Sequence, residues 1–344
     1  MTYRVVGWST GNVGRRAIGA ISRRSNMELV GLWVHSPDKV GVDAGTLAGI
    51  EPIGVAATND VETLLALKPD CVCYTAQGEE FGDRAIREIA RILEAGINVV
   101  TSSSYSMIHP ASMRADWREL LEAAALKGGA TAYSTGIEPG FADDQLAVVL
   151  AMMSETIESV RIQEFFLYDR YDARSVLEGM GFAIPTDQPS KYDEPGHLTS
   201  VWGGSVRLLA DRLGMKLDHI RENYERLATP RKLEVACGTI EAGTTGALRF
   251  QTIGVVEGRD AIIIEHINRM AEDLAPGWPN AAKNGTYRVT FEGNPAFTCD
   301  LAFATPGGGM TAHGMLLVNA IPYVCDAPSG LVTAEDLPIA VPRF

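Results

Sequence analysis

Short apolar runs alternate with longer segments of helical periodicity from Tyr3 to Gly136, and this alternation restricts the fold more than any other feature of the chain. The apolar runs are rich in β-branched residues, as buried strands are, and cover Tyr3–Trp8, Glu28–His35, Asp70–Thr75, Asn98–Thr101 and Thr131–Ser134. The helical segments between them are Val13–Arg23, Val61–Leu67, Phe81–Ala95 and Ala115–Leu126. Strands that alternate with helices in this way predict an α/β domain with a doubly wound parallel sheet.

The pattern changes after Gly140. An apolar helix is predicted there, followed by strand-like runs in which apolar and polar residues alternate: the helix is Asp143–Met153 and the runs are Ser159–Tyr168, Glu234–Ala242, Ala247–Glu257, Asp260–Asn268, Gly285–Phe291 and Thr298–Ala304. They predict an α+β domain with a mostly antiparallel sheet. A second apolar helix is predicted from about Thr311 to Val324. We therefore expect domains at 1–138 and 139–305, and a terminal helix and tail at 306–344.

Composition and charge exclude several classes of protein. The 344 residues are 46% hydrophobic and 21% charged, which is typical of a globular protein long enough for two domains. A net charge of −13 argues against a nucleic-acid partner. No apolar run is long enough to span a membrane and no signal sequence precedes the first strand, so we expect a cytoplasmic protein. The five scattered cysteines suit reduced thiols, and the six histidines lack metal-binding spacing, so we expect no metal site.

The turn after the first predicted strand has the features of a dinucleotide-binding loop. Gly11 would allow the backbone to approach a pyrophosphate, and Gly14 would allow the following helix to pack closely on the strand. The first glycine of the GxGxxG pattern is replaced by Ser9. The position of the turn, after a strand and before a helix, is the one that this motif requires. We expect the cofactor to contact Ser9, Thr10, Gly11, Asn12, Val13 and Gly14.

The end of the second predicted strand bears on the choice between NADP and NAD. An acidic residue at the tip of this strand would bind the ribose 2′-hydroxyl of NAD, and none stands there. His35, Ser36 and Lys39 would instead bind a 2′-phosphate, which favours NADP. Asp38 lies close enough to leave NAD open as the alternative, and the segment could also be a solvated turn.

Several separated motifs resemble the dihydrodipicolinate reductase-like group that includes 2,4-diaminopentanoate dehydrogenases and native amine dehydrogenases. The resemblance covers nearly the whole chain. It rests on Val5–Gly14, Glu28–Gly31, Lys39–Gly45, Thr135–Phe141, Gly254–Gly258, Glu265–Met270 and Val318–Pro322.

The resemblance implies a Rossmann domain, a second α+β domain that mediates dimerisation, and a terminal helix that returns to the cofactor side. It places Thr75 and Ala76 beside the nicotinamide ribose, and Ser102 and Ser103 near the nicotinamide ring. Asn319, on the terminal helix, would face the cofactor pocket. A homodimer with a small-molecule carbonyl or amine substrate is expected.

The sequence departs from the amine-forming members at two places. Ser103-Ser104-Tyr105-Ser106 stands where those members carry a pair of glutamates before a tyrosine and a proline. Glu138 stands where the family has an asparagine, between Gly136 and Pro139. Glu138 could supply the missing carboxylate, or it could reflect an unrelated change of specificity.

Hydride transfer to or from a nicotinamide also requires a group that handles a proton. The candidates for this acid or base are Glu138, Tyr105 and His266, each of which could instead be structural. Phe141, Tyr168 and Tyr171 could form an apolar wall for the substrate. The leading hypothesis is an NAD(P)-dependent oxidoreductase that carries out reversible reductive amination of a small ketone or aldehyde with ammonia. The alternatives are an NADPH-dependent carbonyl or imine reductase that works without ammonia, and a non-catalytic NADP-binding regulator.

Overall fold

The computed structural model describes residues 2–78, 82–305 and 307–342. The start of a predicted helix at Phe81 and the predicted boundary at residue 306 lie outside the described residues. The chain divides into two compact units: unit 1 comprises Met1–Phe141 and Gly309–Phe344, and unit 2 comprises Ala142–Gly308. In the part of the chain that the model describes, no helix combines the length and apolar character needed to cross a membrane.

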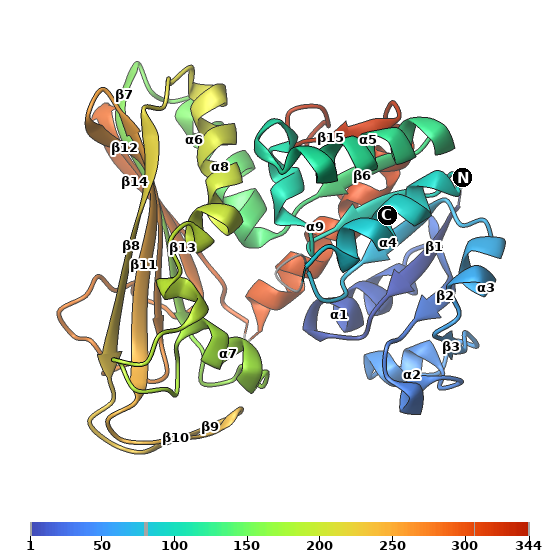
Figure 1. Cartoon of the computed structure of the whole chain (residues 1–344), viewed down its shortest axis with the longest axis horizontal. Helices are drawn as coiled ribbons and strands as arrows, with labels where there is room; N and C mark the ends of the chain where they lie inside the picture. The colour runs from blue at the N-terminus through green and yellow to red at the C-terminus, as the bar shows by residue number, and fades with distance from the viewer. Residues whose placement is uncertain (1, 79–81, 306, 343–344) are drawn as a thin grey trace. The chain divides into compact units, whose positions relative to one another are not determined.

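A seven-stranded sheet forms the centre of unit 1 (Figure 1). Across the sheet, the strands are β15 (Gly330–Val332), β6 (Thr131–Ser134), β5 (Asn98–Thr101), β4 (Cys71–Tyr74), β1 (Tyr3–Trp8), β2 (Met27–Trp33) and β3 (Ala57–Thr58). All neighbouring strands run parallel to one another. The predicted α/β domain with a doubly wound parallel sheet is therefore confirmed.

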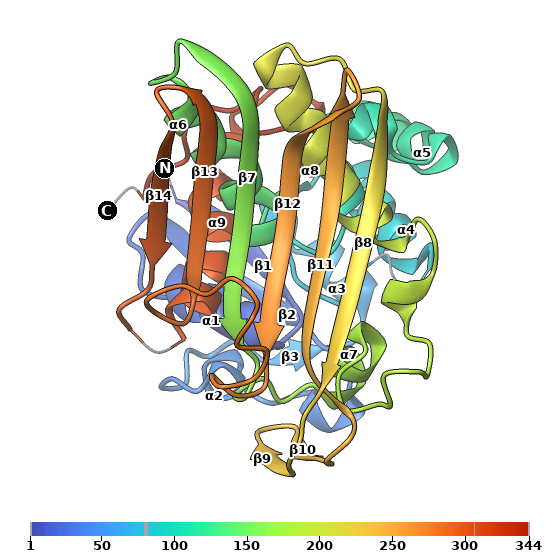
Figure 2. The same ribbon diagram turned by 90° about the vertical axis from the view of Figure 1, so that its left-hand side faces the viewer.

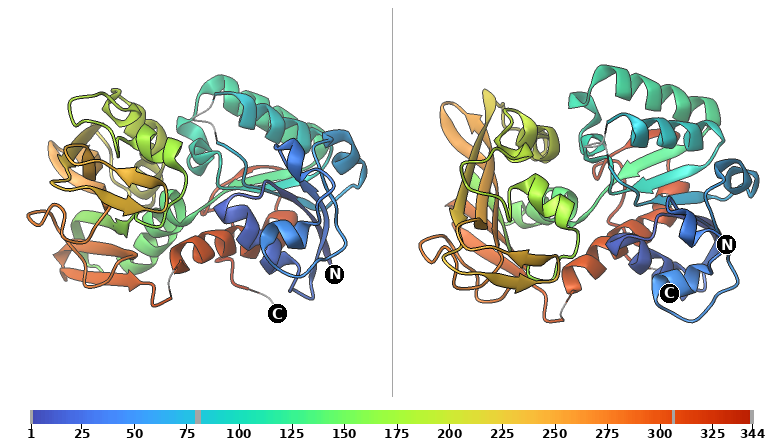
Figure 3. Two further views of the ribbon diagram at one scale, coloured as in Figure 1. Left: turned by 90° about the horizontal axis from the view of Figure 1, so that it is seen from below. Right: turned by 60° about the horizontal axis from the view of Figure 1, so that its bottom comes forward.

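Two separate apolar layers cover the faces of this sheet, because successive residues of each strand point to opposite sides. On one side, Val5 of β1 packs with Ile18 and Leu317, which belong to α1 (Asn12–Ile21) and α9 (Gly308–Cys325). Figure 3 shows α9, in red, beside α1. On the other side, Val6 packs with residues of α3 (Val61–Ala66), α4 (Arg84–Glu94) and α5 (Ala115–Gly128). The remaining helical segments of this unit are α2 (Ala44–Ala48), η1 (Pro37–Lys39), η3 (Tyr105–Ile108) and η4 (Pro110–Ser112).

Unit 2 is built on a six-stranded sheet (Figure 2). Across the sheet, the strands are β14 (Phe297–Ala302), β13 (Thr286–Asn294), β7 (Thr156–Leu167), β12 (Arg259–Arg269), β11 (Thr245–Val256) and β8 (His219–Ala228). Only β7 and β12 pair in parallel, and every other pair in this sheet is antiparallel. The predicted α+β domain with a mostly antiparallel sheet is confirmed.

One face of the unit 2 sheet is covered by α8 (His197–Leu213), whose Trp202 lies 4.5 Å from the Phe250 ring of β11, measured between ring centroids. Among the described residues, no helix lies over the opposite face, which Figure 2 shows in front. Unit 2 also contains α6 (Ala147–Ala151), α7 (Arg174–Met180) and η6 (Lys191–Asp193). The irregular helical segment η5 (Ile137–Leu146) precedes α6.

One expected strand in the second half of the chain is wrong, and one observed strand was not predicted. The predicted strand Glu234–Ala242 is a hairpin of β9 (Leu233–Val235) and β10 (Gly238–Ile240), which pair in a separate two-stranded sheet. The strand that was not predicted is β8, which forms one edge of the six-stranded sheet; every residue of its sequence HIRENYERLA is exposed or half-buried. An edge strand tolerates this polarity, so β8 lacks the alternation by which a strand is recognised.

Candidate functional site

The glycine loop between β1 and α1 has the close contacts that a dinucleotide-binding turn requires. A Cβ atom at Gly14 would lie 2.3 Å from the Ser9 carbonyl oxygen and 2.7 Å from Thr75 Oγ1, so only glycine fits there. At Gly11, a Cβ atom would meet no atom within 4 Å. Ser9 has a φ of +93°, in the left-handed region that glycine normally occupies. The missing first glycine of the motif is therefore replaced by a serine that keeps a glycine-like backbone.

Positive charge surrounds the start of α1. Its first turn contains no acidic residue, and Arg15 and Arg16 both hold Asn12: Arg15 donates to Asn12 Oδ1 at 2.7 Å and Arg16 to the Asn12 carbonyl oxygen at 2.6 Å. Lys39 Nζ donates to Thr10 Oγ1 at 3.0 Å, which joins the end of β2 to the glycine loop. Backbone amides of a helix N-terminus together with these cations suit a pyrophosphate.

Six further residues predicted near the cofactor lie at or just after the carboxyl ends of β2, β4 and β5. His35 follows β2, and its ring lies 6.1 Å from the Trp33 ring, measured between centroids; Ser36 precedes η1. Thr75 Oγ1 donates to the Trp8 carbonyl oxygen at 3.0 Å. Ser103 Oγ donates to the Ala76 carbonyl oxygen at 2.6 Å, and Ser102 precedes it in the chain. Parallel strands end at one edge, so these segments and the glycine loop share that edge of the sheet.

The loop after β6 carries Glu138 and is held in place by α9. The His313 Nδ1 atom accepts a hydrogen bond from the Ile137 amide at 3.4 Å. A Cβ atom at Gly136 would lie 2.8 Å from the Cε1 atom of the same imidazole ring. Glu138 is half-buried, and the loop closes with a hydrogen bond from the Phe141 amide to the Gly136 carbonyl oxygen at 2.9 Å.

Two further predicted site residues, Tyr105 and Asn319, lie in different elements of unit 1. Tyr105 is half-buried at the start of η3, which follows β5. Asn319 Oδ1 accepts a hydrogen bond from Arg24, which comes three residues after the end of α1. The residue of α9 that lies against the beginning of α1 is Gly314, where a Cβ atom would lie 3.2 Å from the Arg16 Cβ.

In unit 2, His266 belongs to a buried polar cluster centred on Glu164. Glu164 Oε1 accepts from His266 Nδ1 at 3.1 Å and from Asn268 Nδ2 at 3.0 Å, and Glu164 Oε2 accepts from the Tyr287 hydroxyl at 3.0 Å. Burial raises the pKa of Glu164, but the charge of His266 and these three hydrogen bonds outweigh burial, so the pKa lies below its ordinary value. Glu164 is therefore a carboxylate.

Aromatic rings enclose the imidazole of this cluster. Phe250 stacks on His266 at 4.3 Å with an interplanar angle of 16°, and Trp202 meets the imidazole at 4.9 Å and 65°. Asn268 is completely buried, and its Oδ1 atom meets no hydrogen-bond donor among the residues that the structure describes. An ionised carboxylate, an oriented imidazole and a buried acceptor thus share one apolar surrounding. Such a group can bind a cationic nitrogen and move a proton.

A second buried carboxylate, Glu265, lies on the uncovered face of the same sheet. Glu265 Oε1 accepts from Arg249 and Gln251 at 2.6 and 2.8 Å, and Oε2 accepts from Arg161 and Gln163 at 3.0 and 2.6 Å. Burial raises the pKa of Glu265, and the two guanidinium groups and their hydrogen bonds lower it below its ordinary value. Every acceptor position here is used by a donor of the protein itself.

The predicted aromatic wall is divided between the units. Tyr168 and Tyr171, which follow β7, lie 5.5 Å apart between ring centroids, whereas Phe141 is at the end of the first segment of unit 1.

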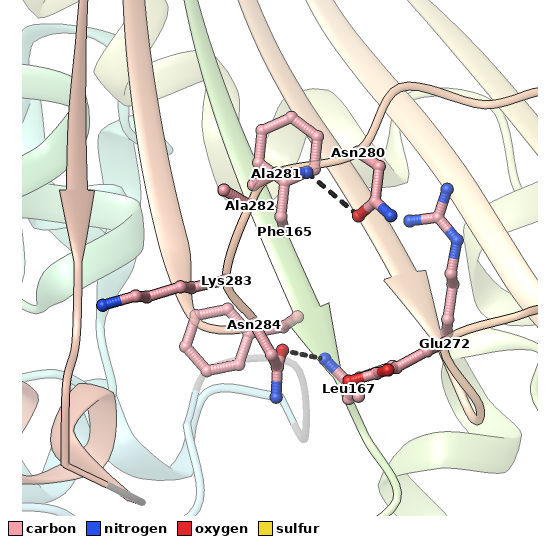
Figure 4. A pocket seen from close by; sticks show the side chains of 10 residues that line it. Phe165, Leu167, Glu272, Asn280, Ala281, Ala282, Lys283 and Asn284 are labelled. Atoms are coloured by element: carbon pink, nitrogen blue, oxygen red, sulfur yellow. Dashed lines mark hydrogen bonds between the residues drawn. The ribbon is translucent and has the colours of Figure 1, made fainter.

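A pocket is present beyond β7 and β12, but its polar groups hold the surrounding loop. Figure 4 shows Asn284 Oδ1 accepting from the Leu167 amide at 2.6 Å and Asn280 Oδ1 from the Ala281 amide at 2.9 Å.

Sequence reasoning did not select Glu164, Asn268, Tyr287 or His313. A signal for the first two exists, since polar residues at alternate positions of otherwise apolar strands point to one buried face. His266 and Asn268 have this spacing in β12, and Glu164 stands between apolar residues and Gln163 in β7.

Comparisons with known proteins agree with this architecture. A family model described as the 2,4-diaminopentanoate dehydrogenase C-terminal domain matches residues 141–343, and a model of the dihydrodipicolinate reductase N-terminus matches residues 1–101. An amine dehydrogenase of Streptomyces virginiae is 37% identical, and the match covers 96% of this chain and 95% of that protein. The 2,4-diaminopentanoate dehydrogenase of Acetoanaerobium sticklandii is 25% identical, with coverage of 98% and 93% respectively.

The fold comparison leads to the same group of proteins. The structure of an amine dehydrogenase from Mycobacterium smegmatis matches with a TM-score of 0.84 at 20% identity, over 100% of this chain and 98% of that one. At this identity the match shows a common fold. Together with the sequence matches along both units, it shows that the chain belongs to the 2,4-diaminopentanoate dehydrogenase and amine dehydrogenase family and is an NAD(P)-dependent oxidoreductase.

Proposed function

We propose that the protein interconverts a small primary amine and the corresponding ketone or aldehyde plus ammonia, with NADP as the preferred cofactor. The observation that carries this proposal is the 37% identity, over 96% of the chain, to a protein named amine dehydrogenase. The buried carboxylate and imidazole of unit 2 supply chemistry that suits an amine. Oxidation of the amine releases a reduced cofactor, ammonium and a carbonyl compound, and reductive amination is the reverse.

The cofactor would be held by unit 1. The amides at the start of α1 and the loop from Ser9 to Gly14 would bind the pyrophosphate, and Thr75, Ala76, Ser102 and Ser103 would line the nicotinamide end. When bound, the nicotinamide supplies the hydride acceptor or donor. The protein supplies the orientation of the substrate and the proton transfers.

NADP is preferred in this proposal because Lys39 lies at the glycine loop, where its ammonium group would neutralise a 2′-phosphate. Lys39→Ala should raise the KM for NADPH by about tenfold or more, since a charged hydrogen bond contributes about 1.5–3 kcal/mol. The KM for NADH should change little. An equal rise in the KM for NADPH and for NADH would mean that Lys39 supports only the conformation of the glycine loop and does not bind the 2′-phosphate.

We further propose that the enzyme is a cytoplasmic homodimer that associates through the uncovered face of the unit 2 sheet. This face carries the Glu265 network and lacks a covering helix among the described elements. Light scattering on the purified protein measures the mass directly, and a mass of 37.0 kDa in dilute solution would mean a monomer.

The decisive experiment follows NADPH absorbance with a panel of small ketones and aldehydes, each with and without ammonium. Oxidation of NADPH that requires ammonium would support amine dehydrogenase activity. Equal rates without ammonium would identify a carbonyl reductase. Binding of NADPH without turnover of any substrate would favour a regulator.

Glu138→Gln tests whether Glu138 is the acid or base of the reaction. If turnover is abolished while NADPH binding is intact, Glu138 takes part in the reaction. If turnover is unchanged, the proton must be handled elsewhere.

A further inference from the structure

We infer that a cavity at one end of the six-stranded sheet binds a small monocarboxylate with a short apolar substituent, through the guanidinium group of Arg269. The cavity is lined by the last three residues of β7, by Arg269 at the end of β12, and by residues 272 and 280–284 of the loop between β12 and β13. All of these residues belong to unit 2, and the inference does not depend on the proposed function.

The first argument is that Arg269 is a buried cation without a counter-ion. The other arginines of this sheet each pair with a carboxylate at 3.6 Å or less; they are Arg161, Arg221, Arg226, Arg249, Arg259 and Arg288. Arg269 is only 5% exposed, and among the residues that the structure describes it pairs with no carboxylate. Burial lowers the pKa of Arg269, but a guanidinium group keeps its proton in proteins. Arg269 therefore carries a positive charge that unit 2 does not neutralise.

The second argument is the way in which the loop holds this guanidinium. Nε donates to the Leu274 carbonyl oxygen at 2.8 Å, and Nη2 donates to the carbonyl oxygens of Ala275, Trp278 and Pro279 at 3.3, 3.5 and 3.0 Å. These neutral oxygens fix the orientation of the guanidinium and leave its charge in place. No acceptor meets Nη1 in the described part of the chain, so its two N–H groups are the ones left for a ligand of the cavity.

The third argument is that the neutral polar groups of the wall are also donors. Asn280 and Asn284 each use Oδ1 to accept from a backbone amide, as the dashed lines in Figure 4 show. Their Nδ2 atoms remain as donors, and no residue with a described position offers an acceptor to either of them. Arg269 and two amide nitrogens on one wall suit the oxygens of an anion.

Charge and size define the class of anion. The other charged residues of the lining, Glu272 and Lys283, are both exposed and have opposite charges, so the charge of Arg269 is the one left over. A ligand with a single negative charge balances it. The cavity has a volume of about 190 Å³, and Phe165, Ala281 and Ala282 give it an apolar part. A carboxylate with a short alkyl group meets both conditions, because pockets for drug-sized ligands are larger, about 300–1,000 Å³.

The test measures binding by calorimetry and needs no enzymatic turnover. Sodium butyrate is titrated into the full-length protein in a buffer without other carboxylates, and butyramide is the uncharged probe of similar shape. Wild type should bind butyrate at least about tenfold more tightly than butyramide, as expected for a hydrogen bond to a charged group. Absence of butyrate binding by wild type, or equal affinity for butyramide, would overturn the inference.

Three variants locate the site. Arg269→Met removes the cation, and Ala281→Leu fills the cavity while Arg269 and its bonds to the loop stay in place. Each should weaken butyrate binding about tenfold or more. Arg221→Met is the matched control, because Arg221 is an arginine of the same sheet that pairs with Asp260, and it should leave the affinity unchanged.

Ala281→Leu decides the test if Arg269→Met does not fold, since Arg269 also holds the loop. Wild-type affinity in Ala281→Leu, or an equal loss of affinity in Arg221→Met, would mean that butyrate does not bind through this cavity.

Methyl NMR on protein with labelled alanine gives a second readout on the unaltered chain. The signals of Ala281 and Ala282, assigned by replacing each residue with serine, should shift as butyrate is added, with the midpoint that calorimetry gives. If butyrate binds and neither signal shifts, the ligand lies elsewhere and the inference is wrong.

Discussion

The sheet of unit 2 buries one glutamate on each face, and the two are compensated differently. Glu265 accepts from two arginines and two glutamines, so positive charge and hydrogen bonds satisfy it fully within the protein. Glu164 accepts from a histidine, an asparagine amide and a tyrosine, and among the described residues no donor meets the Oδ1 atom of that asparagine. A carboxylate that is already neutralised serves the fold, whereas one paired with a titratable ring remains able to respond to a ligand.

Variants of Glu164 and its partner His266 should lower the rate of turnover, whereas a variant of Glu265 should not. His266→Gln should lower kcat for amine oxidation about 10³-fold, as removal of a general base does, and Glu164→Gln about 10²-fold. Glu265→Gln should keep kcat within about threefold after correction for folded protein, because it does not touch the site. Steady-state rates with NADP over a range of pH measure kcat for each variant. An equal loss of kcat in Glu164→Gln and Glu265→Gln would contradict the predicted difference between the two glutamates.

The free energy of unfolding should fall more in Glu265→Gln than in Glu164→Gln, the reverse of the order expected for kcat. Glu265→Gln should lose about 3 kcal/mol, at the lower end of what breaking a buried ion pair costs, because Arg161 and Arg249 are 36% and 24% exposed.

The pH dependence of this loss follows from the lowered pKa of Glu265. The stabilisation is present above the ordinary value of about 4.5 and disappears as the pH falls through the folded-state pKa, so wild type and variant should converge in acid. Urea unfolding at several pH values measures the difference in free energy of unfolding between wild type and Glu265→Gln. If this difference stays constant at all pH values, the stabilisation does not come from the ionised Glu265 carboxylate.

Asp144 sharpens the comparison, because it is a buried acid that lacks the donors of the two glutamates. Burial raises its pKa to about 6, and the backbone amide of Gln145 offsets this only in part. Because the folded state holds the proton more tightly, its stability falls as the pH rises from about 4 to about 6. Asp144→Asn should therefore be more stable than wild type by about 2 kcal/mol at about pH 7.5 and equal to it below about pH 4. Thermal unfolding at both pH values tests the sign.

The smallest change removes one donor from Glu164. Tyr287→Phe deletes the hydrogen bond to Oε2 and should cost about 1 kcal/mol in stability. It should also raise the pKa of Glu164 and shift the acid limb of the kcat profile upward. Arg288→Lys on the next residue, whose side chain binds Asp300, is the control and should leave the profile in place. A shift in the control alone would point to a general effect of β13.

Much of the fold could be predicted because its signals are local. The strands of unit 1 are buried on both faces, so they are continuous apolar runs that stand out between helices. The strand β8 could not be predicted, because it lies at an edge and its residues are mostly charged or polar. The hairpin at Glu234–Ala242 has strand-forming residues, but nothing in its sequence indicates that it pairs only with itself.

The two parts of the candidate site differ in the same respect. The glycine loop lies within a few residues of sequence, so its position after β1 and before α1 could be read directly. Glu164, His266 and Tyr287 come from three strands, and the register between these strands brings them together. His266 pairs directly with Glu164 across β12 and β7, and Tyr287 pairs with Glu164 across β13 and β7. Sequence periodicity gives the face of each residue but not its partner.

The contact between Gly136 and His313 has a consequence for the evolution of this family. Any side chain at position 136 would enter the space of the imidazole, since even a Cβ atom would lie 2.8 Å from it. A substitution at 136 is therefore acceptable only after His313 has become smaller, and a smaller residue at 313 removes the acceptor for the Ile137 amide. The two positions, 177 residues apart in the chain by their numbers, should change together among descendants of this sequence.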